Sequence, residues 1–173
     1  MKKTIALITL TGLLFISCKK EETKAPAEVK NPNQFGINID KSDNIELVKK
    51  LNVMASTFDL VNFKSNFTAD AILHDNMNDV TIDENVKMLE ALKSKGVTAT
   101  LGKEPLIWEA INDKPNEKTG ITNYVICYYE VTFARNGKSA KINYNMVFAM
   151  KDGKVQEEWD TYDSAPIAEL LKQ

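Results

Sequence analysis

The chain has 173 residues, which fits one domain of ordinary size. Its 22 Lys and Arg residues against 24 Asp and Glu residues give a net charge of −2, which argues against nonspecific binding of nucleic acid. Two cysteines are too few for a disulfide scaffold or a thiolate zinc site, and one histidine excludes sites that need two imidazoles. We therefore expect a globular domain with no metal and no cofactor.

The first seventeen residues have the layout of a secretory signal. A basic start, Met1-Lys2-Lys3, precedes an apolar run from Thr4 to Ile16. At about 1.5 Å per residue this run is too short to cross a bilayer core of about 30 Å as a permanent helix. We expect residues 1–17 to be removed from the mature protein.

The end of the run, Phe15-Ile16-Ser17-Cys18, resembles the lipobox of bacterial lipoproteins. The resemblance implies cleavage before Cys18, lipidation of that cysteine, and anchoring to the membrane of a bacterial cell envelope, here assigned to the outer membrane. A plain secretory signal is the alternative. The charged stretch 19–22 resembles export tags on surface lipoproteins of the Bacteroidota, or is a solvated spacer, so the periplasmic and surface sides stay open.

Residues 18–40 are predicted to be a flexible tether. They are rich in Lys, Glu, Pro and Asn, and they have almost no apolar content before Phe35. Such a segment buries too little surface to offset its ordering entropy. The folded domain is expected to span 41–173.

A first helix is predicted over 43–57, with Asp43 and Glu46 as a capping pair at its start. Its apolar face repeats at helical spacing. That face consists of Leu47, Leu51, Met54 and Phe58.

Two further helices and a short strand follow. A second helix fits 60–66 with Asp59 as its N-cap, and a short strand fits 71–74. A third helix begins at Thr81, where Glu84 completes a capping box.

After these helices the pattern changes to strands rich in β-branched and aromatic residues. The predicted strands are 97–111, 121–134, 139–150 and 154–162. Pro105 interrupts the first, and the dipeptides Asn136-Gly137 and Asp152-Gly153 predict tight hairpins. The fold class is therefore α+β, with three N-terminal helices packed on an antiparallel sheet.

The predicted strands are apolar on both faces. In 139–150, Ile142 and Met146 share one face while Val147 and Ala149 lie on the other. A sheet with one wet face alternates more cleanly. We therefore expect both faces to be covered, one by helices and one by a second copy in a homodimer.

Two segments resemble the SnoaL-like group of the nuclear-transport-factor-2-like superfamily. The segment 67–75 reads FTADAILHD, and the segment 151–163 reads KDGKVQEEWDTYD with its Gly-Lys turn, tryptophan and terminal aspartate. The resemblance covers about 43–168 and implies a cone-like fold, a curved sheet around helices with a pocket at the open end. The superfamily includes cyclases, isomerases, dehydratases and binding modules, so the fold alone does not determine the function.

The resemblance implies candidate catalytic residues. Isomerases and cyclases of the superfamily use a carboxylate to remove a proton beside a carbonyl. His74 on the first strand and Asp160 or Asp163 on the last are the candidates here. Alternation places Asp160 and Tyr162 on one face of the last strand and Asp163 on the other, and the choice between the two aspartates stays open. Each candidate has an ordinary structural role as its alternative.

Four aromatic residues of the strands are candidate lining for a pocket, with ordinary core packing as the alternative. They are Trp108, Tyr128, Tyr144 and Trp159. We expect a noncatalytic module that binds a small apolar ligand or serves in assembly. The alternative is a cyclase- or isomerase-type enzyme that uses carboxylate and histidine acid–base catalysis on an apolar carbonyl substrate.

Overall fold

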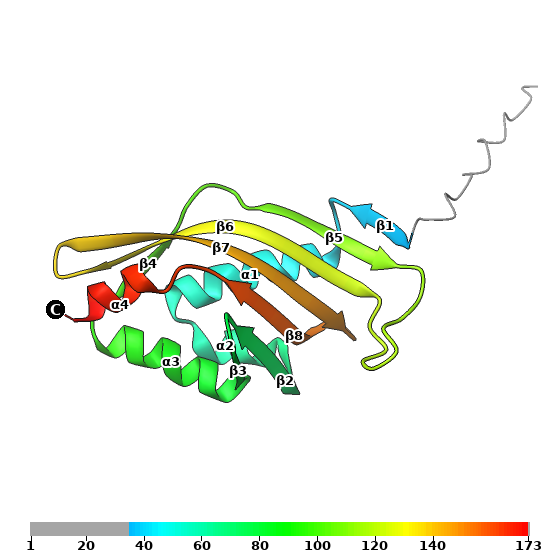
Figure 1. Cartoon of the computed structure of the whole chain (residues 1–173), viewed down its shortest axis with the longest axis horizontal. Helices are drawn as coiled ribbons and strands as arrows, with labels where there is room; N and C mark the ends of the chain where they lie inside the picture. Colours follow the sequence, from blue (N-terminus) through cyan, green and yellow to red (C-terminus); the bar gives the residue numbers. More distant parts are fainter. Residues whose placement is uncertain (1–34, 173) are drawn as a thin grey trace, which may run out of the picture. The chain divides into compact units, whose positions relative to one another are not determined.

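A computed structural model of the protein describes residues 35–172, and within them it places four helices and eight strands (Figure 1). The predicted signal peptide, the predicted lipidation site Cys18 and most of the predicted tether lie outside these residues. None of the helices in the described part is long and apolar enough to cross a membrane.

The strands form one sheet. They are β1 Gly36–Ile39, β2 Phe67–Asp75, β3 Asn78–Thr81, β4 Thr98–Leu101, β5 Leu106–Asn112, β6 Asn123–Arg135, β7 Lys138–Lys151 and β8 Lys154–Thr161. Their order is β1-β5-β6-β7-β8-β2-β3, and β4 pairs with β6. The prediction of an antiparallel sheet is wrong for one strand pair, because β2 and β8 are parallel. A parallel pair needs a long connection, which the chain between β2 and β8 provides.

The helices are α1 Asp43–Thr57, α2 Leu60–Ser65, α3 Ile82–Ser94 and α4 Ala165–Leu171. The first three agree with the sequence predictions and lie on one side of the sheet (Figure 1). The fourth was not expected, although Pro166 lies in its first turn, where proline is tolerated. The α+β class with three N-terminal helices is confirmed.

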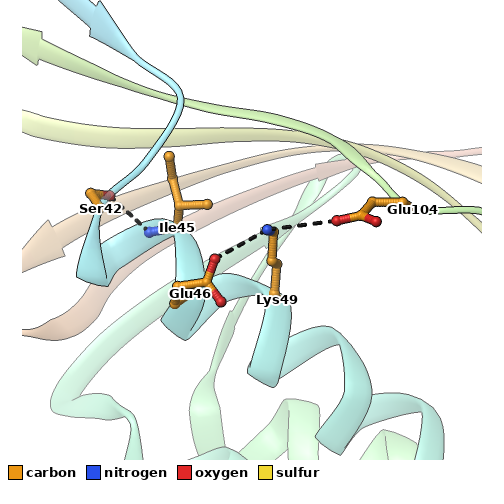
Figure 2. Close-up of polar contacts among 5 residues, drawn as sticks. All are labelled: Ser42, Ile45, Glu46, Lys49 and Glu104. Carbon is orange, nitrogen blue, oxygen red and sulfur yellow. Dashed lines mark hydrogen bonds and ion pairs between the residues drawn. The ribbon is translucent and has the colours of Figure 1, made fainter.

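The start of α1 differs from the predicted capping pair (Figure 2). Ser42 has an extended backbone and is the N-cap, and its Oγ accepts a hydrogen bond from the Ile45 N–H at 3.0 Å. Asp43 and Glu46 lie inside the first turn, where their charges favour the positive end of the helix dipole. The predicted Asp43–Glu46 cap is therefore wrong, because the serine one residue earlier fills the position.

Lys49 connects α1 to the segment between β4 and β5 (Figure 2). Its Nζ donates to Glu46 Oε1 at 3.1 Å and lies 3.7 Å from Glu104 Oε1. These groups are largely exposed, so the pairs contribute little stability.

The two other predicted caps have different outcomes. Asp59 precedes α2, but its side chain makes no capping hydrogen bond and accepts instead from Asn62 Nδ2 at 2.8 Å. The capping box of α3 is confirmed: Thr81 Oγ1 accepts from the Glu84 N–H at 3.2 Å, and the Thr81 N–H donates to Glu84 Oε2 at 2.8 Å.

Strand β1 lies where the sequence predicted the end of the tether, so that prediction is wrong for 36–39. The strand pairs with β5, with Gly36 opposite Asn112 and Ile39 opposite Glu109. The edge of β5 offers unpaired backbone groups that a short segment can pair with. Gly36 is needed because a Cβ there would lie 2.1 Å from the carbonyl oxygen of Ile111.

The strand boundaries follow the turn signals. Pro105 lies between β4 and β5, where the sequence predicted an interruption. Asn136-Gly137 and Asp152-Gly153 have positive φ at both positions and connect β6 to β7 and β7 to β8. The predicted strand at 71–74 is longer, and β3 was not expected.

The core lies between the helices and the inner face of the sheet. Its fully buried side chains come from α1, β2, β6, β7 and β8; they include Ile45, Val48, Leu51, Leu73, Val125, Cys127, Phe148 and Val155. Glu109 is also buried, and its Oε1 accepts from Asn44 Nδ2 at 2.7 Å and Asn123 Nδ2 at 2.6 Å. This carboxyl is paired as buried polar groups usually are.

Candidate ligand-binding cavity

A cavity of about 420 Å³ lies between the helices and the inner face of the sheet. Most of its wall is apolar; examples are Leu51, Leu89, Leu92, Val131, Phe133, Met146 and Phe148. Helix α4 contributes Ile167 and Leu171. The Arg135 guanidinium holds this helix by donating to the Leu170 carbonyl at 3.2 Å and, through Nε, to the Lys95 carbonyl at the end of α3 at 2.8 Å. The unpredicted fourth helix therefore forms part of the wall.

Three carboxyl groups enter the cavity from two neighbouring strands. Asp75 ends β2, and Glu158 and Asp160 lie on β8. In the parallel pair Asp75 is directly opposite Asp160, and Glu158 is two residues earlier on the same face of β8. The register of one strand pair thus brings the three groups together. We call them the carboxyl cluster.

The carboxyl cluster is incompletely hydrogen-bonded. Glu158 is only 3% exposed, and Asp75 and Asp160 are half-buried. One buried oxygen of each member has no hydrogen-bond partner within residues 35–172: Asp75 Oδ1, Glu158 Oε2 and Asp160 Oδ1. Asn85 Oδ1, which reaches the cavity from α3, is also unpartnered. A buried acceptor without a partner costs folding free energy, so a ligand that donates to it is favoured.

Burial raises the pKa values of two members of the cluster. It holds the pKa of Glu158 well above the ordinary value, and the neighbouring Asp160 adds to the shift through its charge and a hydrogen bond. Burial also raises the pKa of Asp160 to about 7, while a hydrogen bond from Glu158 acts in the opposite direction and the charge of Asp75 adds to the rise. The pair therefore retains protons near neutral pH.

Three tyrosines complete the polar part of the wall. The Tyr129 and Tyr144 rings stack with centroids 5.3 Å apart, and the Tyr144 and Tyr162 centroids are 4.4 Å apart. Burial raises the pKa of all three, with the charge of Asp160 contributing in each case. They are therefore neutral phenols that can donate a hydrogen bond.

The sequence candidates divide between the cavity and the outer face. Asp160 and Tyr144 line the cavity. His74 does not: its ring stacks on Trp159 with centroids 5.0 Å apart, and its Nδ1 lies 2.7 Å from Asp79 Oδ1. Asp163 Oδ1 accepts from the Ala165 N–H at 3.0 Å, at the start of α4.

Trp108 and Tyr128 also lie outside the cavity lining. Trp108 pairs with Ile126 on the outer face, and Tyr128 pairs there with Leu106. Leu106 is 66% exposed and Tyr128 is 47% exposed. The outer face therefore shows apolar side chains to solvent, and the homodimer stays a prediction.

Sequence reasoning missed Asp75, Glu158, Tyr129 and Asn85 as cavity residues. Glu158 has the same parity as Asp160, so the alternation of one strand was a usable signal. Asp75 could be assigned to the cavity only from the pairing of β2 with β8, which the sequence does not show. Within residues 35–172 there is no group of three or more His, Cys, Asp or Glu side chains placed to hold a metal ion.

No protein-family model matches the chain. A search of curated proteins finds no match either. Solved structures do match. A candidate polyketide cyclase from Xanthomonas campestris has a TM-score of 0.57 at 11% identity, covering 75% of this chain and 96% of its own.

Two other solved structures extend this likeness. A nuclear-transport-factor-2-like protein from Burkholderia xenovorans has a TM-score of 0.56 at 11% identity, covering 77% of this chain and 98% of its own. A candidate SnoaL-like polyketide cyclase from Shewanella putrefaciens has a TM-score of 0.54 at 14% identity, covering 77% and 88%. The chain therefore has the SnoaL-like, nuclear-transport-factor-2-like fold that the sequence predicted. At these identities the likeness establishes the fold alone.

Proposed function

We propose that the domain is a noncatalytic module that binds a small, largely apolar molecule in the cavity. The observation that carries the proposal is an apolar cavity whose buried acceptors have no partner among residues 35–172. Apolar walls with a few convergent polar groups are typical of small-molecule sites. Neither His74 nor Asp163 lines the cavity, so two of the three candidate catalytic residues do not support an enzyme.

A cavity-filling variant tests this proposal. Ala99 of β4 lines the cavity, whereas Thr100, the next residue, is exposed. We expect Ala99→Phe to reduce binding of the neutral dye Nile red at least about tenfold, and Thr100→Phe to leave it unchanged. Equal binding by both variants would contradict the proposal. If Ala99→Phe reduces binding as expected, mass spectrometry of protein purified from its native envelope would identify the copurified ligand.

We also propose that the domain is carried by a lipoprotein anchored at the outer membrane through Cys18. The support is the resemblance of residues 15–18 to a lipobox and the basic and apolar segment before it. Cys18→Ser should abolish labelling by a radioactive fatty acid and release the protein from the membrane. Cys127→Ser is the matched control, because it removes the only other cysteine and should keep the label.

Acid–base catalysis is the second candidate function, and the pKa of Asp160 favours it. A carboxyl that titrates near 7 in an apolar cavity can accept a proton beside a carbonyl, and a neutral tyrosine such as Tyr144 can donate to the enolate oxygen. If this is the function, the protein should accelerate deuterium exchange of 2-tetralone in D₂O and Asp160→Asn should abolish the acceleration. No acceleration by the wild-type protein favours the binding module.

A further inference from the structure

Resting on the proposed binding function, we propose that the ligand carries a protonated amine on an apolar body, and that the amine lies at the carboxyl cluster. The cluster supplies acceptors and, when ionised, negative charge, the tyrosines supply hydroxyl groups, and the remaining wall supplies apolar surface. Each feature selects one part of this ligand.

The first argument is the hydrogen-bond inventory. Four buried side-chain oxygens that line the cavity have no hydrogen-bond partner within residues 35–172: one each from Asp75, Asn85, Glu158 and Asp160. An amide oxygen and ionised carboxylates only accept, and a protonated primary amine has three donors and no acceptor, so it matches this set once the carboxyls are ionised. A ligand carboxylate offers only acceptors, so it could pair only with carboxyls that keep their protons.

The second argument is charge. The three carboxyls enter the cavity from β2 and β8, and the lining contains one basic residue, Lys95, which is exposed at the end of α3. His74 is on the outer face with Asp79. Within the part of the chain that the structure describes, no buried cation therefore neutralises the negative charge that the cluster develops on ionisation. An ammonium group would neutralise it where the dielectric constant is low.

The third argument is the tyrosine hydroxyl groups. Tyr129, Tyr144 and Tyr162 line the cavity from β6, β7 and the residue after β8. Burial and the charge of Asp160 raise the pKa of each, so they are neutral phenols. Their hydroxyl oxygens can accept further hydrogen bonds from an ammonium group.

Three compounds with one body and different heads test the proposal. We would titrate 4-phenylbutylamine, 4-phenylbutanol and 4-phenylbutanoate into the purified full-length chain by calorimetry at pH 7. The amine should bind at least about tenfold more tightly than the alcohol, the difference expected for a charge-assisted hydrogen bond. Binding of the amine should also release protons, because it favours ionised carboxyls, so its heat should differ between phosphate and Tris buffers.

Variants assign the effect to the cluster. Asp160→Asn and Glu158→Gln should each weaken amine binding about tenfold and leave alcohol binding within about threefold. Glu157→Gln is the control, because Glu157 is on the same strand and pairs with Ile72 on the opposite face. Circular dichroism checks that each variant is folded.

The outcomes separate the two proposals. If the alcohol or the carboxylate binds as well as the amine, this inference fails and the binding function stands. If none of the three compounds binds and Nile red does not bind either, both fail. If Nile red binds and the amine does not, the amine proposal alone is overturned.

Discussion

Strands β2 and β8 present titratable side chains on both of their faces. On the outer face, His74 stacks on Trp159 and its Nδ1 lies 2.7 Å from Asp79. On the inner face, one residue further along each strand, Asp75 and Asp160 enter the cavity. The outer histidine has a partner, whereas the inner carboxyls have oxygens without one.

This difference shows that burial, and not residue type alone, determines which side chain is suited to acid–base chemistry here. Histidine is the usual acid–base residue near neutral pH, yet His74 is on a face that reaches solvent. An aspartate is ordinarily ionised at neutral pH, yet burial raises the pKa of Asp160 to about 7. The carboxyl with the raised pKa, Asp160, is thus on the strand beside His74 and faces the opposite side of the sheet.

The largest expected change in the free energy of unfolding concerns side-chain packing on the two faces of the sheet. Leu73 of β2 is 1% exposed on the inner face, and Ile72 beside it is half-buried on the outer face. We expect Leu73→Ala to lower the free energy of unfolding by about 3 kcal/mol, because it leaves a cavity in the core. Ile72→Ala should cost about 1 kcal/mol. Urea denaturation measures both, and equal costs would contradict the assignment of the inner face as the core.

A smaller effect tests the buried charge. Asp160 keeps its proton up to about pH 7 in the folded chain, whereas its unfolded value is near 3.8. The protonated carboxyl thus favours the folded state below about pH 4, and this contribution is lost as the pH rises toward 7. We expect the contribution of Asp160 to the free energy of unfolding to fall by about 2 kcal/mol across this interval, since Asp160 retains partial exposure.

The variant Asp160→Asn should make the fall smaller by about 2 kcal/mol, because an amide does not titrate, while Glu158, whose pKa burial also raises, still contributes to it. Urea denaturation at pH 4, 5.5 and 7 measures it. Glu157→Gln, on the outer face of the same strand, should keep the pH dependence of the wild-type protein. A variant Asp160→Asn whose stability falls as far as that of the wild-type protein would show that Asp160 does not cause the effect.

Local signals in the sequence were sufficient for most elements. The capping box at Thr81, the interruption at Pro105 and the hairpin at Asn136-Gly137 each depend on a few neighbouring residues, and each was found. The parallel pairing of β2 with β8 depends on residues far apart in the chain. No local pattern encodes it, so the sheet was expected to be antiparallel throughout.

The site was also predictable only in part, because local alternation is visible in the sequence and long-range pairing is not. Alternation along β8 placed Asp160 and Tyr162 on one face, and both line the cavity. The sequence could not show which face was inner, so the choice between Asp160 and Asp163 stayed open. Asp75 became part of the site only through its register with Asp160. The cluster is therefore a product of long-range pairing.

The smallest effect tests the outer pair directly. His74 and Asp79 have side chains that are 27% and 73% exposed, so their interaction is screened by water. We expect His74→Ala to lower the free energy of unfolding by less than about 1 kcal/mol, mainly through loss of the stacking on Trp159. Binding of Nile red and of 4-phenylbutylamine should not change, and Asp79→Asn should behave in the same way. If His74→Ala alone weakens binding in calorimetry, the histidine acts on the cavity through the strand pair, and the two faces are not independent.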